Sequence, residues 1–262
     1  MCFLLAVVFR YRRQVIETNL EKAFPEKSDR ERAAIRRQFY HHLCDLLLET
    51  FKTLTCSPAF AKRHCRFDPD TEALFRHYAT RGQSIFIVMG HYGNWEWAGN
   101  SFSLLCKQPL YVIYHPVKNR YFNRFTIRMR KRFGTGLIPM KEVYRELVKH
   151  KDQVSATAFI ADQTPSSSDN AYWTRFMNQD TPVFRGTELL AKKLNYPVIF
   201  ASVNRLRRGY YEMTAQTIFE TPAATAEGEI SEAHTRMLEA AIHRDPANWL
   251  WSHRRWKRKK PE

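Results

Sequence analysis

Residues 84–99 read Ser-Ile-Phe-Ile-Val-Met-Gly-His-Tyr-Gly-Asn-Trp-Glu-Trp-Ala-Gly, and this stretch decides the fold. The apolar run Ile85–Met89 predicts a short buried strand. Glycines on both sides of His91 predict a tight turn, because glycine adopts backbone angles that other residues avoid. A helix then begins, with Asn94 as its predicted N-cap. Strand, turn and helix in this order are the building unit of α/β proteins.

The same turn carries a candidate catalytic pair, His91 and Glu96. Residues five apart in one continuous helix lie roughly 140° from each other, so only a fold-back at the turn brings the two side chains together. A carboxylate that accepts the Nδ1–H of an imidazole fixes its tautomer, which leaves Nε2 free to take a proton from a hydroxyl group. We therefore predict Glu96 as the partner of His91. The pattern equally fits a His that only caps the helix and a solvated first-turn Glu.

Beyond this unit, strands and helices alternate through residues 84–218, so we expect an α/β fold with a central mixed, largely parallel sheet flanked by helices. One predicted strand, 154–160, runs directly into Asp162 and Gln163. Polar residues at the carboxyl ends of strands are where α/β proteins place their sites, which makes both side chains candidates. An ordinary Asx-turn is the alternative. At 262 residues the chain suits one domain.

The formal net charge of +16 indicates an acidic partner, such as an anionic membrane surface, an acidic protein, a phosphorylated substrate or nucleic acid. The predicted helix within 118–132 concentrates this charge. Arginines at four-residue steps form a stripe on it, namely Arg120, Arg124, Arg128 and Arg132. Guanidinium groups bind phosphate and carboxylate well, although such a stripe is as often a solvated helix face.

Cysteine and motif content narrow the class of protein further. The five cysteines are odd in number and lack C-x-x-C spacing, which favours a reducing compartment without disulfides or a zinc site. No Walker, Rossmann or H-E-x-x-H motif occurs, so we expect neither a cofactor nor a metal. No nucleic-acid-binding motif accompanies the positive charge.

Both ends of the chain have compositions typical of membrane contact. Residues 1–10 are mostly apolar and precede a basic cluster, which indicates the remnant of a membrane anchor or, alternatively, a buried first helix. Residues 28–54 predict an amphipathic helix whose basic face meets solvent or anionic lipid. The tail, 246–262, alternates Trp with Lys and Arg, and we interpret it as interfacial. The polar stretch 166–179 is a candidate lid or membrane-touching flap.

Taken together, several motifs resemble one family, the lipid A biosynthesis acyltransferases of the lysophospholipid acyltransferase superfamily. The similarity spans nearly the whole chain in order. It includes Gly90-His-Tyr-Gly-Asn-Trp-Glu96, which fits the family's His-x4-acid motif, and Asp162-Gln163. It also includes Phe184-x-Gly186, Arg128-x-Arg130 before Phe133-Gly134, and the ending Trp249-x-Trp251-x-His253-x-Arg255-Trp256-Lys257.

The resemblance implies a glycerolipid-acyltransferase-like fold and transfer of a fatty acyl chain from acyl carrier protein to a hydroxyl of a phosphorylated lipid A precursor. It places the enzyme at the cytoplasmic face of the bacterial inner membrane. His91 is then the general base and Glu96 its orienting acid. The implied substrate-binding positions are His115, Asn119, Arg128, Arg130, Asp162 and Gln163.

Two departures from the family pattern stand out. The sequence has Tyr114-His115-Pro116 where relatives often carry Tyr-Arg-Pro, so an oxyanion contact from that Arg would fall to His115 or move elsewhere. Relatives also begin with a full membrane helix, whereas this sequence starts with the short segment 1–10. A glycerophospholipid or aminolipid acceptor remains an alternative, as does a basic binding protein without catalysis.

Overall fold

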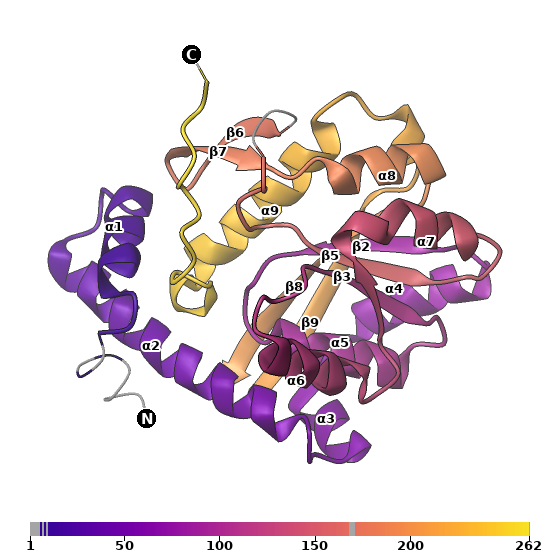
Figure 1. Ribbon diagram of the computed structural model, residues 1–262, viewed down its shortest axis with the longest axis horizontal. Coiled ribbons are helices and arrows are strands. Elements are labelled where there is room, and N and C mark those ends of the chain that lie inside the picture. Colours follow the sequence, from indigo (N-terminus) through magenta and orange to yellow (C-terminus); the bar gives the residue numbers. More distant parts are fainter. Residues whose placement is uncertain (1–5, 7, 9, 168–170, 262) are drawn as a thin grey trace.

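The computed structural model describes residues 6, 8, 10–167 and 171–261 (Figure 1). The helices are α1 Arg13–Ala23, α2 Asp29–Lys52, α3 Pro58–His64, α4 Pro69–Thr80, α5 Trp95–Leu105, α6 Arg120–Lys131, α7 Val143–Lys149, α8 Gly186–Leu194 and α9 Glu229–Arg244. The strands are β1 Cys65–Phe67, β2 Ile85–Met89, β3 Leu110–Tyr114, β4 Gly136–Pro139, β5 Ala156–Ile160, β6 Tyr172–Phe176, β7 Gln179–Val183, β8 Val198–Arg207 and β9 Tyr210–Phe219.

A seven-stranded sheet lies at the centre, in the order β1-β9-β8-β2-β5-β3-β4. Every neighbouring pair is parallel except β8 and β9, which form an antiparallel hairpin. Strand β2 sits in the middle and is buried along its full length, as the apolar run predicts. The predicted mixed, largely parallel sheet flanked by helices is confirmed.

Helices cover both faces of the sheet (Figure 1). On one face, α4 and α5 pack against alternate residues of β2, represented by Ile85, Ile87 and Met89. On the other, α7, α8 and α9 pack against Phe86 and Val88. Successive side chains of a strand point to opposite faces, so β2 contributes to both halves of the core.

The turn after β2 has the geometry that its glycines predict. Gly93 adopts φ +62°, and a Cβ built there would lie 2.0 Å from the Val203 carbonyl oxygen of β8. Only glycine fits this conformation and this close approach. The Asn94 side chain accepts a hydrogen bond from the Trp97 backbone N–H at 2.9 Å, which confirms it as the N-cap of α5. The turn therefore delivers His91 to the carboxyl edge of the sheet.

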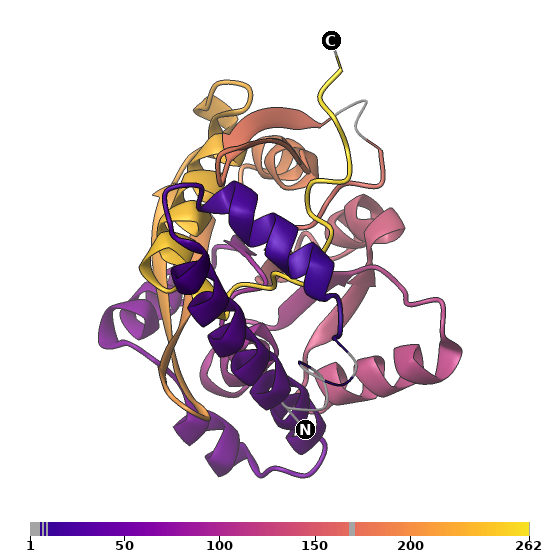
Figure 2. The same cartoon turned by 90° about the vertical axis from the view of Figure 1, so that its left-hand side faces the viewer.

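Helices α1 and α2 lie side by side, in front of the C-terminal segment in Figure 2. Ser28 and Glu31 form the capping box that starts α2, in agreement with the amphipathic helix predicted for 28–54. The side chain of Asn19 in α1 donates to the Trp251 carbonyl oxygen at 2.8 Å. These contacts hold the chain's last segment between α1–α2 and α9.

The interpretation of the 246–262 tail as an interfacial, Trp-exposing segment is wrong for its first two tryptophans. Trp249 is 2% exposed and Trp251 is fully buried. Their rings pack edge to face at 4.7 Å, and Trp251 also contacts Phe24, the residue that follows α1. The tail is apolar because it fills a core between helices, and composition alone does not separate that role from membrane contact.

Two further predictions concern the chain's margins. The prediction of a polar lid over 166–179 is only partly matched by the structure. Strand β6 in its second half pairs with β7 in an antiparallel hairpin. Residues 168–170 lie outside the described part of the chain. Most of the predicted anchor, residues 1–5, 7 and 9, also lies outside it and stays a prediction. Among the described residues, no helix has both the length and the apolar character needed to cross a bilayer.

Candidate active site

Two neighbouring parallel strands, β2 and β5, bring His91 and Asp162 together at their carboxyl ends. The Nδ1 atom of His91 lies 2.6 Å from Asp162 Oδ1, and the His91 backbone N–H donates to Oδ2 at 2.9 Å. The Asp162 side chain is 3% exposed, whereas that of His91 is 16% exposed. One carboxylate thus grips both the ring and the backbone of the histidine, and the ring keeps an open side.

Hydrogen bonds keep the buried Asp162 ionised. Burial alone would raise the pKa of this carboxyl group, but the neighbouring His91 and the hydrogen bonds from His91 and Trp249 outweigh burial and lower it to about 2. A permanent carboxylate facing Nδ1 holds the proton on that nitrogen. Nε2 is therefore left as the basic atom, and the side-chain amide of Gln163 lies 3.3 Å from it.

The C-terminal segment fixes this pair in place. Trp249 donates from Nε1 to Asp162 Oδ2 at 2.8 Å. The backbone N–H of Leu250 donates to the His91 carbonyl oxygen at 3.1 Å, and that of Gly93 donates to the Asn248 carbonyl oxygen at 3.0 Å. On the far side of the pair, the Thr164 backbone N–H donates to His253 Nε2 at 3.3 Å. The tail thus braces both loops that carry the candidate pair.

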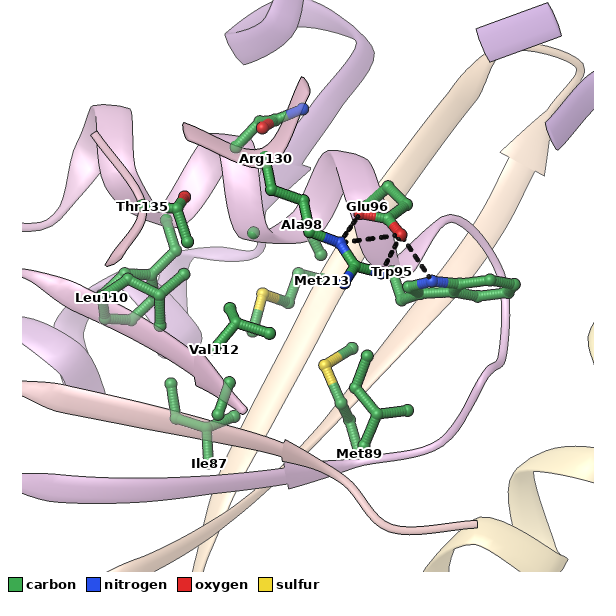
Figure 3. A pocket seen from close by; sticks show the side chains of 15 residues that line it. Ile87, Met89, Trp95, Glu96, Ala98, Leu110, Val112, Arg130, Thr135 and Met213 are labelled. Carbon is green, nitrogen blue, oxygen red and sulfur yellow. Dashed lines mark hydrogen bonds and ion pairs between the residues drawn. The ribbon is translucent and has the colours of Figure 1, made fainter. Parts of the chain in front are cut away.

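The prediction that Glu96 orients His91 is wrong. Glu96 lies in the first turn of α5, but its carboxylate turns toward α6, where Arg130 donates from Nε at 2.9 Å and from Nη2 at 2.5 Å (Figure 3). Trp95 adds a longer contact from its indole nitrogen at 3.3 Å. A bidentate guanidinium is a far better partner for this largely buried carboxylate than a neutral imidazole, because it offers two charge-assisted hydrogen bonds.

A largely apolar pocket lies between α5 and the sheet (Figure 3). Met89 and Ile160 line its upper level, Ile87, Ala158 and Val112 the next, and Leu110 a deeper one, as the strand register orders them. The Glu96–Arg130 pair also lines it. Trp95, another wall residue, packs edge to face on the His91 ring at 4.8 Å.

The remaining predicted substrate-binding residues lie apart from the pair. Asn119 caps α6 by accepting from the Tyr121 and Phe122 backbone N–H groups. His115 is exposed after β3, and its Nδ1 contacts the Pro116 carbonyl oxygen. Arg128 is exposed on α6. Their assignment to substrate binding stays a prediction. Among the described residues, no cluster of His, Cys, Asp and Glu is arranged to hold a metal ion.

Comparison with known proteins gives the family. Residues 2–258 match the sequence model described as bacterial lipid A biosynthesis acyltransferase. The chain belongs to this family. It is 24% identical over 268 residues to the lipid A biosynthesis palmitoleoyltransferase of Escherichia coli, covering 98% of this chain and 85% of the relative. The lipid A biosynthesis acyltransferase of Shigella flexneri matches with the same identity and coverage.

Membership establishes this lipid A biosynthesis acyltransferase as an acyl-transferring enzyme. The sequence pattern predicts His91, Asp162 and Gln163 as site candidates but does not predict the hydrogen bond from Trp249 to the Asp162 carboxylate. A signal existed, since Trp249 belongs to the tail motif that carries the family resemblance.

Proposed function

We propose that the enzyme transfers a fatty acyl chain from the thioester of acyl carrier protein to a hydroxyl group of a phosphorylated lipid A precursor, with His91 as general base and Asp162 as its orienting acid. The observation that carries the proposal is the 2.6 Å contact between His91 Nδ1 and Asp162, beside an apolar pocket. Glu96 takes no part in orienting the base.

The chemistry follows from the atoms at the pair. The acceptor hydroxyl lies at His91 Nε2 in place of the Gln163 amide and gives up its proton as its oxygen attacks the thioester carbonyl carbon. The tetrahedral intermediate then collapses: the carbon–sulfur bond breaks, and the imidazolium returns the proton to the departing thiolate. Asp162 stabilises the imidazolium that forms between the two steps.

The pocket provides the place for the acyl chain. Its walls are mostly apolar apart from the Glu96–Arg130 pair, and Trp95 in the wall touches the His91 ring. A chain lying along the strands puts its carbonyl carbon at the carboxyl edge of the sheet, near Nε2. The depth at Leu110 and Gly99 then limits how long the chain can be.

The charge of the protein suits both substrates. A formal charge of +16 attracts an acidic carrier protein and a phosphorylated lipid, and steering of this kind raises encounter rates. A lipid acceptor also requires work at a membrane surface, so we propose the cytoplasmic face of the bacterial inner membrane as the location. The enzyme needs no cofactor for this reaction, because the thioester already carries the activated acyl group.

The test is acyl transfer by the purified chain from acyl carrier protein to a lipid A precursor, followed by mass spectrometry of the lipid. We expect one added acyl group per acceptor with the wild type and none with His91→Ala. Substantial transfer by His91→Ala would exclude the mechanism. Transfer to a glycerophospholipid but not to the lipid A precursor would exclude the acceptor while leaving the chemistry intact.

A further inference from the structure

Helices α2 and α6 together expose an unusual amount of apolar surface. Leu48 and Phe51 near the carboxyl end of α2 are 52% and 56% exposed, and Tyr121 and Phe122 at the start of α6 are 70% and 52% exposed. Large apolar side chains scattered singly over a surface are ordinary, but a contiguous group of them marks an interaction site.

Ring contacts join Phe51 of α2 to Phe122 of α6. Phe51 packs on Phe125 of α6 with ring centroids 5.0 Å apart, and Phe125 packs on Phe122 at 6.0 Å. Leu48 lies one helical turn before Phe51 on the same face of α2. Figures 1 and 2 both place α6 beside the carboxyl end of α2. We call Leu48, Phe51, Tyr121, Phe122 and Phe125 the aromatic face.

The charge on the α6 side of the aromatic face has one sign, and the acids of the adjoining part of α2, Asp45 and Glu49, are buried. From Trp97 through Lys141 the sequence contains no Asp or Glu but nine Lys and Arg residues. Three of these cations are exposed arginines on α6 itself, Arg120, Arg124 and Arg128. None of the three has an ion-pair partner in the described part of the chain. The face therefore presents uncompensated guanidinium groups around aromatic rings.

This combination distinguishes between classes of partner. Aromatic side chains flanked by long cationic side chains are enriched where proteins meet the lipid headgroup layer. Arginine keeps its charge among headgroup phosphates while its aliphatic stem lies along apolar neighbours. Each cation near an anionic leaflet also adds attraction, and acids, which would be repelled, are absent from this segment.

We propose that the aromatic face is a docking surface for an anionic lipid bilayer, and that docking there turns the active-site pocket toward the membrane. The second part rests on the proposed function, because it assumes a lipid acceptor. Helix α6 links the two sites: its outer side carries Tyr121 and Phe122, and its inner side sends Arg130 to Glu96 in the pocket wall. A bilayer held by the outer side thus lies next to the pocket.

The test is cosedimentation of the full chain with vesicles of phosphatidylglycerol and phosphatidylethanolamine. For the double variant Phe51→Ser/Phe122→Ser we expect at least a tenfold lower partition coefficient, because two exposed rings are lost. For Arg124→Gln/Arg128→Gln we expect about a fivefold loss per charge on these vesicles and no loss on vesicles of phosphatidylcholine alone. The matched control is Tyr144→Ser/Leu189→Ser, which removes residues 46% and 54% exposed on α7 and α8, across the sheet.

A second readout reports contact directly, whatever else in the chain binds lipid. A tryptophan introduced as Phe122→Trp should lose fluorescence on vesicles with brominated acyl chains, whereas one introduced as Leu189→Trp should not. Unchanged partition of Phe51→Ser/Phe122→Ser together with no quenching at position 122 would overturn the proposal. So would normal vesicle binding by that variant combined with lost acyl transfer in detergent micelles, since the face would then dock the carrier protein.

Vesicle binding needs no turnover, so the measurement separates this proposal from the proposed function. His91→Ala should bind vesicles as tightly as the wild type. If it does, and if the wild type transfers no acyl group to any lipid, the docking surface stands and the enzymatic assignment falls.

Discussion

Asp162→Asn discriminates most sharply between the two acids that flank His91. In the wild type, Asp162 Oδ2 accepts from the His91 backbone N–H and from Trp249, while Oδ1 faces His91 Nδ1 at 2.6 Å. An asparagine side chain keeps both N–H donors satisfied only if its single oxygen occupies the Oδ2 position. Its NH₂ group must then point at Nδ1.

That orientation inverts the imidazole. An NH₂ group donates, so Nδ1 must become the acceptor and the ring proton must move to Nε2. The nitrogen facing the acceptor hydroxyl then carries a proton and cannot act as a base. General-base catalysis contributes about 10²- to 10⁴-fold, and we expect kcat to fall by about this factor, which corresponds to about 3–5 kcal/mol. Since the N–H donors stay satisfied, the fold should be preserved.

The assay is steady-state acyl transfer with saturating carrier-bound donor, with urea unfolding as the check on folding. Glu96→Gln is the matched control, because it makes the same acid-to-amide exchange five residues from His91. Glu96 contacts Arg130 and not the ring, so this variant should lose substrate binding at the pocket wall more than kcat. Near-normal kcat in Asp162→Asn with a 10²-fold loss in Glu96→Gln would refute the assignment of the orienting acid.

Three further predictions follow from the turn, the pocket and a buried histidine. An alanine in the left-handed backbone conformation costs about 1–2 kcal/mol. Gly93→Ala should lower the free energy of unfolding in urea by more than this, because its Cβ would also lie 2.0 Å from the Val203 carbonyl oxygen. Gly134→Ala, at φ +95° with open space around it, should show the strain alone, and equal losses in the two variants would contradict this account. Gly99→Leu should fill the pocket beside Leu110 and cost the longest acyl donors at least about tenfold in kcat/KM relative to short ones, and a uniform loss for all chain lengths would count against the pocket as the acyl site. Burial lowers the pKa of His234 from 6.5 to about 4, so the unfolded chain binds a proton more readily and stability is lost as the pH falls from about 6.5 toward 4. Between pH 7.5 and 5 this histidine should cost about 2 kcal/mol, and His234→Leu should remove that part of the pH dependence in urea unfolding, whereas an unchanged pH slope would show that His234 is not the group responsible.

The sequence predicted those parts of the fold that local chemistry controls. The apolar run of β2, the glycine at position 93 and the Asn94 cap each act within a few residues, and all three appear as expected. Asp162 was found because the end of a parallel strand has a known place in the sheet. Its pairing with His91 was not predicted, because that contact depends on which strands become neighbours, and 66 residues separate the end of β2 from the start of β5.

The prediction that the 246–262 tail is interfacial was wrong for a related reason. Tryptophan between Lys and Arg fits both a membrane interface and a segment that buries its rings and leaves its cations outside. The tail tryptophans are buried because α1, α2 and α9 leave a space that they fill, and sequence periodicity does not reveal that space. In the structure the tail helps to position Asp162. Trp249 donates a hydrogen bond to the Asp162 carboxylate, and His253 accepts one from Thr164 in the loop after Asp162.

Glu96 does not contact His91, but its contact with Arg130 shapes the pocket. The spacing of His91 and Glu96 does bring both side chains to the carboxyl edge of the sheet, but on different sides of the turn. Asp162 pairs with His91, and Glu96 forms an ion pair with Arg130 of α6. The Glu96–Arg130 pair forms part of the pocket wall. In the proposed mechanism, the turn therefore places the base next to a wall of the acyl-chain pocket, while Asp162 at the end of β5 fixes the tautomer of that base. A variant that spares Asp162 but breaks the Glu96–Arg130 pair should loosen chain binding without silencing the base, and that separation is what the Glu96→Gln control measures.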